Sequence, residues 1–190
     1  MKISQKPLLI IALESEEQGR LATLGFDIVY CGVGKINAGY RLMRALHANG
    51  MRYPYVLNLG SAGSHQLDAG QLVEIERFVQ RDMDATGLGF ALGETPFDPF
   101  PHHITVPRRF GHLRGGTCAS GDSFLQTPSP IPCDVIDMEA YALAKVCLHE
   151  EIPFTSVKYI TDGANGSASK DWHENLRYAA DSFAELLQAA

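Results

Sequence analysis

Short apolar runs alternate along this chain with segments suited to helices, and this alternation constrains the fold more than any other feature. The runs of strand length cover residues 7–13, 26–34, 55–63, 71–79, 116–125, 133–136 and 153–163. The segments that predict helices cover residues 14–25, 35–50, 137–151 and 170–188, and the proline-rich residues 93–111 predict a loop. Such alternation favours an α/β fold with a mostly parallel sheet, helices on both faces and binding loops at the carboxyl ends of the strands.

Composition narrows the class of protein. We expect one domain, residues 1–190, because neither a repeat nor a shift in composition divides the chain. A net charge of −6 without clustered Lys or Arg argues against binding nucleic acid or an anionic membrane. The first apolar run is too short for a signal sequence or a membrane span. Four widely spaced cysteines without a C-x-x-C pair favour a reduced, cytoplasmic protein.

Two glycine-rich turns follow predicted strands and offer backbone N–H groups to a ligand. CGVGK (31–35) lacks the spacing of a dinucleotide fingerprint or a P-loop, so a tight strand–helix junction is the alternative. NLGSAG (58–63) suits an anion, a ribose or a water, and equally a plain turn. The histidines lack metal-ligand spacing and no serine stands in a G-x-S-x-G elbow, so we expect neither a metal site nor covalent catalysis.

Carboxylates collect at the carboxyl ends of the predicted strands. They are Glu14, Glu16, Glu17, Asp122, Asp137, Glu139 and Asp162. Because several strand ends meet at one edge of such a sheet, these acids predict a site rich in hydroxyl and proton-transfer contacts. Asp137 is equally well placed to cap the following helix, and both interpretations stay open for it.

Seven segments stand in order along the chain: ALESEE, CGVGKINA, NLGSAG, RDMDATGLG, ASGDSFL, VIDMEAYALAKVC and PFTSVKYITDGAN. Together they resemble the nucleoside phosphorylase/nucleosidase superfamily, and within it the 5′-methylthioadenosine/S-adenosylhomocysteine nucleosidases. The resemblance implies a three-layer α/β/α fold with a central mixed, mostly parallel sheet. It also implies hydrolysis of the N-glycosidic bond of an adenine nucleoside, without a cofactor, by a homodimer.

The resemblance implies a role for each of three carboxylates. Asp162 would protonate N7 of the leaving adenine, and burial under apolar neighbours favours the proton that this role needs. Glu139 would bind ribose hydroxyls and stabilise the oxocarbenium-like sugar. Glu16 would take a proton from the attacking water.

Further positions are implied to bind the substrate: Leu13, Val33, Ser61, Leu88, Phe124, Leu125, Asp137, Met138, Lys158 and Trp172. By the resemblance, Phe124 stacks on the purine and Leu125 contacts its edge. Leu13, Val33 and Trp172 line the pocket of the 5′ substituent, and Leu88 falls where a dimer partner reaches into it. Lys158 replaces an arginine of many bacterial nucleosidases, which suggests a preference for methylthioadenosine.

Two other functions stay open beside hydrolysis. A purine nucleoside phosphorylase would need a cationic phosphate site, yet Asn58 stands where such enzymes carry arginine. A catalytically silent nucleoside-binding or storage protein would have no need of Glu16, Glu139 and Asp162 together. The chain is also shorter than typical members of the family, before CGVGK and around residues 93–115, and it carries Asp137 where glutamate is usual.

Overall fold

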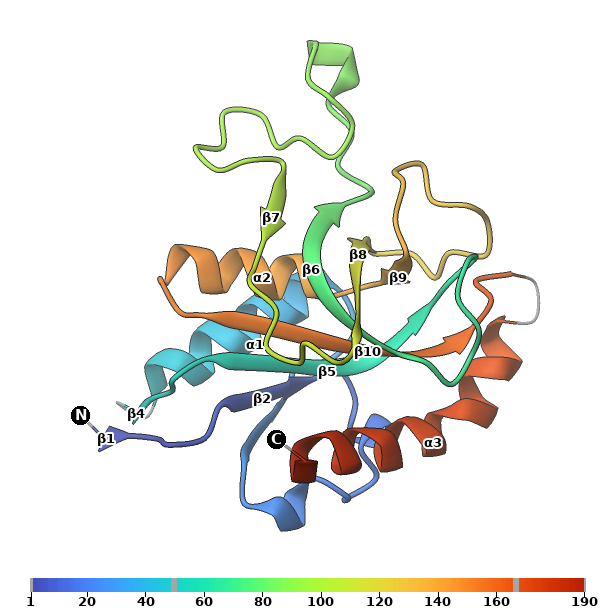
Figure 1. Cartoon of the computed structure of the whole chain (residues 1–190). Helices are drawn as coiled ribbons and strands as arrows, with labels where there is room; N and C mark the ends of the chain where they lie inside the picture. The colour runs from blue at the N-terminus through green and yellow to red at the C-terminus, as the bar shows by residue number, and fades with distance from the viewer. Residues whose placement is uncertain (1, 49–50, 166–167, 190) are drawn as a thin grey trace.

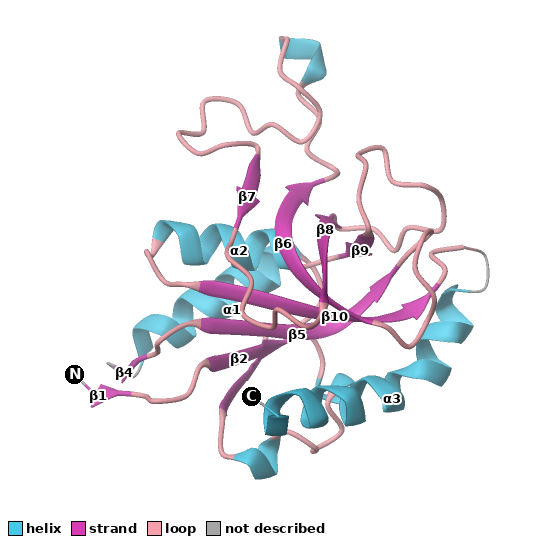
Figure 2. Ribbon diagram, in the orientation of Figure 1, coloured by secondary structure: helices cyan, strands magenta, loops and turns pink. Residues whose placement is uncertain are grey.

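A mixed β-sheet lies between helices in the computed structural model, which describes residues 2–48, 51–165 and 168–189 (Figures 1 and 2). The strands are β1 (Lys2–Ile3), β2 (Leu8–Ile11), β3 (Asp27–Tyr30), β4 (Met51–Arg52), β5 (Val56–Gly63), β6 (Leu72–Gln80), β7 (His103–Thr105), β8 (Arg114–Ser120), β9 (Val135–Asp137) and β10 (Phe154–Asp162). Strands β1 and β4 pair with each other in a separate two-stranded sheet, and the other strands form the mixed sheet. The helices are α1 (Lys35–Ala48), α2 (Ala140–His149) and α3 (Ala168–Ala189), with 3₁₀ turns η1 (Glu14–Glu16), η2 (Ala22–Leu24) and η3 (Thr86–Leu88).

The sheet is mixed and mostly parallel, as predicted. Strand β2 pairs in parallel with β3 and β5, and β5 pairs in parallel with β10. Strand β10 continues antiparallel to β6, and β6, β8 and β9 follow in parallel. A single antiparallel bridge then joins β9 back to β5, so the sheet closes on itself from β5 through β10, β6, β8 and β9. This closure could not be predicted from the sequence, because strand periodicity carries no information about pairing partners.

Alternate residues of the buried strands face two separate layers of helix. In β2, Leu8 and Ile10 belong to the core that includes α1 and α2, whereas Leu9 and Ile11 belong to the core that includes α3. This follows from the period of two in a strand, and it requires continuous apolar runs rather than alternating ones. The three-layer α/β/α prediction is therefore confirmed, with α3 on the opposite face from α1 and α2 (Figure 2).

The predicted helix over residues 14–25 is wrong. The segment forms only the 3₁₀ turns η1 and η2, separated by Gln18 and Gly19 with φ of 49° and 75°. Left-handed backbone interrupts an α-helix, so the acids of this segment sit on a tight turn instead. The other helices form, although α2 begins at Ala140 rather than at residue 137.

The predicted loop over residues 93–111 contains one short strand, β7, which pairs with β6. The chain between β6 and β7 extends away from the body of the molecule and carries η3 at its tip (Figure 1). Within the described residues, no helix has the length and apolar character needed to cross a bilayer.

Candidate active site

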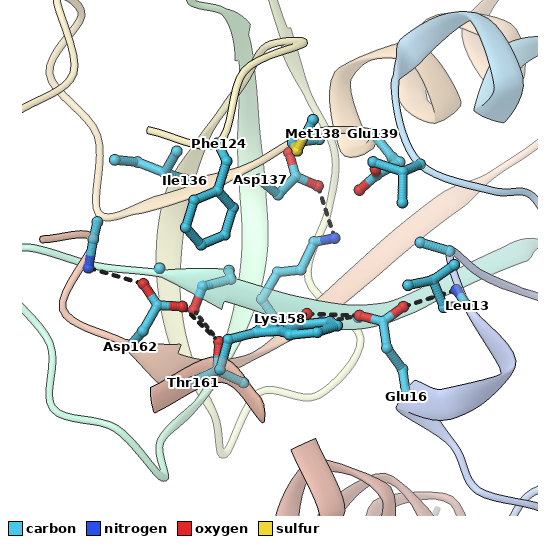
Figure 3. A pocket seen from close by; sticks show the side chains of 18 of the residues that line it. Leu13, Glu16, Phe124, Ile136, Asp137, Met138, Glu139, Lys158, Thr161 and Asp162 are labelled. Carbon is cyan, nitrogen blue, oxygen red and sulfur yellow. Dashed lines mark hydrogen bonds and ion pairs between the residues drawn. The ribbon is translucent and has the colours of Figure 1, made fainter. Parts of the chain in front are cut away.

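A cavity of about 320 Å³ lies where the carboxyl ends of β5 and β10 meet the end of β9 and the starts of α2 and α3 (Figure 3). Among the residues that line it are twelve of the predicted site residues: Leu13, Glu16, Val33, Ser61, Phe124, Leu125, Asp137, Met138, Glu139, Lys158, Asp162 and Trp172. The three carboxylates assigned to catalysis are thus brought to one cavity from three separate segments. Only Leu88 of the predicted set lies elsewhere.

Glu16 is held by backbone and side-chain donors. Its Oε1 accepts hydrogen bonds from Ser61 N at 2.8 Å and Ser61 Oγ at 2.7 Å, and its Oε2 accepts one from Leu13 N at 3.0 Å. Trp172 Nε1 donates to Ser61 Oγ at 2.8 Å, so the serine hydroxyl hydrogen is directed to Glu16. Three donors therefore fix the position and orientation of the Glu16 carboxyl group.

Lys158 and Asp137 form a buried ion pair beneath the cavity. Lys158 Nζ lies 2.8 Å from Asp137 Oδ2, and Gly60 makes room for it, since a Cβ there would be 3.2 Å from Nζ. Burial would lower the pKa of Lys158, but the Asp137 carboxylate raises it above the ordinary value. Burial would raise the pKa of Asp137, but the Lys158 ammonium and several hydrogen bonds hold it below the ordinary value.

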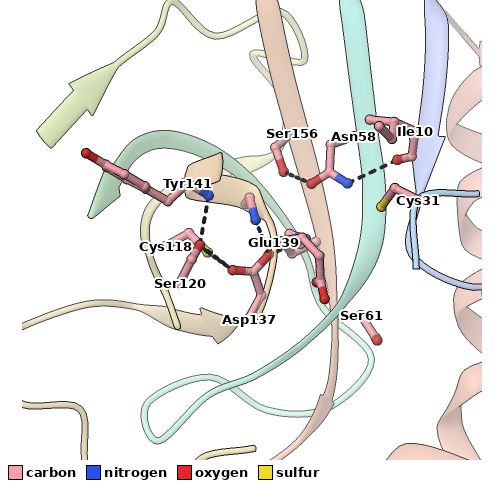
Figure 4. A network of polar contacts seen from close by, with 12 residues as sticks. Ile10, Cys31, Asn58, Ser61, Cys118, Ser120, Asp137, Glu139, Tyr141 and Ser156 are labelled. Carbon is pink, nitrogen blue, oxygen red and sulfur yellow. Dashed lines mark hydrogen bonds and ion pairs between the residues drawn. The ribbon is translucent and has the colours of Figure 1, made fainter. Parts of the chain in front are cut away.

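Asp137 has both of the roles that its sequence position left open. It accepts a hydrogen bond of 2.9 Å from Ala140 N at the start of α2, and it lines the cavity. Ser120 Oγ donates to its Oδ1 at 2.5 Å and in turn accepts a hydrogen bond from Tyr141 N (Figure 4). The side chain is therefore fixed by the helix, by Ser120 and by Lys158 at once.

Glu139 is a carboxylate whose proton affinity is raised by its surroundings. Burial, followed by the nearby Asp137 carboxylate, raises the pKa of Glu139 to about 7, against the opposing effect of Lys158. Its Oε1 accepts a hydrogen bond of 2.8 Å from Gly34 N, in the turn before α1. The CGVGK turn therefore contributes to the site through a backbone donor as well as through Val33.

Asp162 is buried at the end of β10 and faces the cavity (Figure 3). Thr161 Oγ1 donates to its Oδ2 at 2.8 Å, and Ala164 N donates to its Oδ1 at 2.9 Å. A Cβ at Gly63 would lie 2.7 Å from Oδ1, so this position must be glycine for the carboxylate to fit. Gly60 and Gly63, which flank Ser61 and Ala62, thus leave room for two side chains of β10, Lys158 and Asp162.

One wall of the cavity comes from the turn after β8. Phe124 turns its ring toward the cavity although it is 51% exposed, and Leu125 lies beside it. An exposed aromatic ring at the rim of a pocket can stack on a flat ligand. Met138 completes the wall next to Glu139.

Other strand-end carboxylates do not enter the cavity. Glu17 is buried but accepts hydrogen bonds from Leu21 N at 2.8 Å and Tyr30 Oη at 2.7 Å. Asp122 accepts one from Lys35 N at 2.8 Å, and Glu14 is exposed. Leu88 is 75% exposed on η3, away from the cavity of its own chain.

Four supporting positions were missed. They are Cys118, Ser120, Thr161 and the backbone N–H of Ala164, each of which hydrogen-bonds to a cavity carboxylate. Thr161 and Ser120 stand at strand ends beside predicted residues, which was the available signal. The Ala164 donor had no signal in its residue type.

Lys158 is the single lysine or arginine among the described residues that line the cavity. Within the same described ranges, no group of three or more His, Cys, Asp or Glu is arranged to hold a metal ion.

The sequence matches the model of the phosphorylase superfamily over residues 17–190. This chain belongs to the phosphorylase superfamily. A 5′-methylthioadenosine/S-adenosylhomocysteine nucleosidase of Geobacillus kaustophilus is 30% identical over 192 residues, which cover 90% of this chain and 80% of the relative. The superfamily membership and the similarity to these nucleosidases that the sequence motifs indicated are confirmed.

Two solved structures from Helicobacter pylori have the same fold as this chain. A 5′-methylthioadenosine/S-adenosylhomocysteine nucleosidase superposes with a TM-score of 0.86 at 22% identity and covers 97% of both chains. A futalosine hydrolase superposes with a TM-score of 0.86 at 22% identity and covers 97% of this chain and 96% of its own. At these identities the likeness establishes the fold alone.

Proposed function

We propose that this superfamily member is a nucleosidase that hydrolyses the N-glycosidic bond of an adenine nucleoside such as 5′-methylthioadenosine or S-adenosylhomocysteine. The observation that carries the proposal is the meeting of Glu16, Glu139 and Asp162 in one cavity of about 320 Å³. Its relatives' names, at identities of up to 30%, point to the same reaction.

Each carboxylate has a separate task in this reaction. Asp162 protonates N7 of the adenine as the bond breaks, and the Thr161 hydroxyl and Ala164 N hold its carboxyl group in place. Glu139 binds the ribose hydroxyls and stabilises the positive charge that develops on the sugar. Glu16, oriented by Ser61, takes a proton from the water that attacks the anomeric carbon.

Water fits this site better than phosphate does. The one lining cation among the described residues, Lys158, is already paired with Asp137. Asn58, where a phosphorylase would carry arginine, donates to Ile10 O at 3.0 Å and accepts from Ser156 Oγ at 2.8 Å (Figure 4). A phosphate dianion would therefore meet the carboxyl groups of Glu16, Glu139 and Asp162, and the described lining residues offer it no fork-shaped donor.

Adenine release from 5′-methylthioadenosine, measured with and without phosphate, tests the proposal. Equal rates in the two buffers are expected for hydrolysis, with a free sugar as the second product. A strict need for phosphate would identify the phosphorylase instead. Binding of the nucleoside without release of adenine would identify the silent nucleoside-binding protein, which the convergence of three carboxylates argues against.

The proposal includes a homodimer of single-domain chains in the cytoplasm. Support for the dimer comes from exposed apolar side chains on the described surface: Ile36, Tyr40 and Met43 along α1, and Leu88 and Phe97 on the segment between β6 and β7. Sedimentation velocity should show a dimer, and Leu88→Glu should weaken it. A fully active monomer would exclude the dimer.

A further inference from the structure

Arg81 is a buried cation outside the catalytic group. It follows β6 directly and is 4% exposed. None of the ion pairs found in the described ranges of the chain includes it. Its Nε is buried without a hydrogen-bond partner. An arginine in such surroundings costs considerable desolvation free energy, so an apolar side chain of similar size would be the cheaper choice for stability alone.

The guanidinium is instead directed at one turn. Arg81 Nη2 donates to Gly121 O at 3.0 Å and to Ser123 O at 2.5 Å, and Nη1 donates to Ser123 Oγ at 3.0 Å. The planar guanidinium presents its donors in a rigid fork, so these bonds fix the orientation of the turn as well as its distance. The next residue, Asp82, accepts a hydrogen bond of 2.8 Å from Asp122 N. Two consecutive residues at the end of β6 therefore hold three consecutive residues after β8.

Gly121 is fitted to this arrangement. A Cβ at this position would lie 2.8 Å from both Cζ and Nη1 of Arg81. Such a distance is well below van der Waals contact, so the backbone lies directly on the guanidinium. Any side chain at position 121 would push the turn and Arg81 apart.

The turn that Arg81 holds continues into the wall of the cavity. Ser123, Phe124 and Leu125 all line the cavity, and Phe124 has half of its surface exposed. A half-exposed ring has few packing contacts of its own to define its position. Its placement therefore depends on the backbone of residues 121–123, which Arg81 and Asp82 anchor.

We propose that Arg81 is a positioning residue for the base-binding wall, which sets the turn so that Phe124 and Leu125 meet the purine of the nucleoside. This inference rests on the proposed nucleosidase function. It separates the molecule into a ribose side, built on Glu16 and Glu139, and a purine side whose geometry depends on a buried arginine that does not touch the substrate. Loosening the turn should weaken base binding more than it slows the chemistry.

Two variants test this role. Arg81→Lys keeps the charge but loses the fork, and Gly121→Ala keeps Arg81 but displaces the turn. Arg114→Lys, on the surface end of β8, is the matched control for an arginine-to-lysine change. For each protein, kcat and KM for 5′-methylthioadenosine and the Kd of adenine, by calorimetry, are measured.

We expect KM and the adenine Kd to rise by about 10-fold in both variants, because misplacement of binding groups by a fraction of an ångström weakens a site substantially. The value of kcat at saturation should stay within about 3-fold of wild type. The control should match wild type. Unchanged KM and adenine Kd in folded variants, or a loss of kcat alone, would overturn the proposal, as would failure of both variants to fold. Wild-type protein that binds adenine but leaves nucleosides intact would refute only the proposed function. Wild-type protein that neither releases nor binds adenine would refute both.

Discussion

The Lys158 ammonium lies 2.8 Å from the Asp137 carboxylate, and their side chains are only 2% and 1% exposed. The two residues come from β10 and from the end of β9. The closure of the sheet brings these strands to the same cavity. Both charged groups are therefore shielded from solvent, and they lie beside the catalytic carboxylates.

Removing one partner of this pair should be strongly destabilising. Lys158→Met leaves the Asp137 carboxylate buried and unpaired, and breaking a buried pair costs about 3–5 kcal/mol of the free energy of unfolding. Urea denaturation at pH 7 measures the loss. The double variant Asp137→Asn/Lys158→Met should be more stable than Lys158→Met alone, because no charge is stranded. If the loss of stability in the double variant equals the sum of the losses in Lys158→Met and Asp137→Asn, the two side chains are not coupled.

Glu16→Gln should abolish the general base, because the amide cannot take the proton from water, while a side chain of nearly the same size and shape is kept. Turnover of 5′-methylthioadenosine should fall by about 10²–10⁴-fold, the usual contribution of a positioned acid or base. Glu17→Gln is the matched control, because Glu17 is also buried but hydrogen-bonds to Leu21 and Tyr30 away from the cavity. We expect the control to lower stability and leave kcat close to wild type. Similar losses of kcat in both variants would assign Glu16 a structural role.

Asp162→Asn should lower turnover on adenine nucleosides by at least about 100-fold, because the amide cannot transfer a proton to N7. The amide oxygen can still accept the hydrogen bond from Ala164 N, and the amide NH2 can donate to the Thr161 hydroxyl oxygen, so the fold should be kept. Asp181→Asn, which changes a surface residue paired with Arg20, is the control. Near-normal adenine release by Asp162→Asn would rule out the N7-acid role.

The pH dependence of turnover should report Glu139. Its pKa is raised to about 7 by burial and by Asp137, and the proposed role requires the ionised form. The rate should therefore fall as the pH drops through 7, and a pH profile of kcat/KM between pH 5.5 and pH 8.5 measures it. A profile that stays flat across pH 7 would show that ionisation of Glu139 does not limit the reaction.

The same pKa shift predicts that stability depends on pH in the direction opposite to the rate. As the pH rises through 7, the rate should rise and the free energy of unfolding should fall. The pKa of Glu139 rises from 4.5 to about 7 on folding, so folding favours the protonated form. The stability it contributes is complete below pH 4.5 and is lost as the pH rises through 7. Glu139→Gln lacks this loss, so its melting temperature relative to wild type should increase between pH 4.5 and pH 7 and then stay constant. Activity of the variant should be low throughout.

Much of the fold follows from local patterns. The apolar runs of β2, β5 and β10 predicted buried strands because their residues face helices on both sides. The helix predicted over residues 14–25, which form η1 and η2, was wrong, since acidic residues followed by glycine suit a helix as well as a pair of tight turns. Closure of the sheet through β9 and β5 depends on one bridge, between Gly63 and Ile136, which no pattern in either strand announces.

By itself, the sequence determined most of the segments that become strands and helices, and which residue types stand at the strand ends, because both depend on neighbours within a few positions. The motifs also determined the superfamily. Only the tertiary structure decided that Glu16 meets Ser61, 45 positions away, and that Glu139 meets Gly34, 105 positions away. It also decided that Glu17 and Asp122 face elsewhere, and that burial and the Asp137 carboxylate raise the pKa of Glu139 to about 7. Burial and the distance between charges set those properties, and neither quantity exists until the chain has folded.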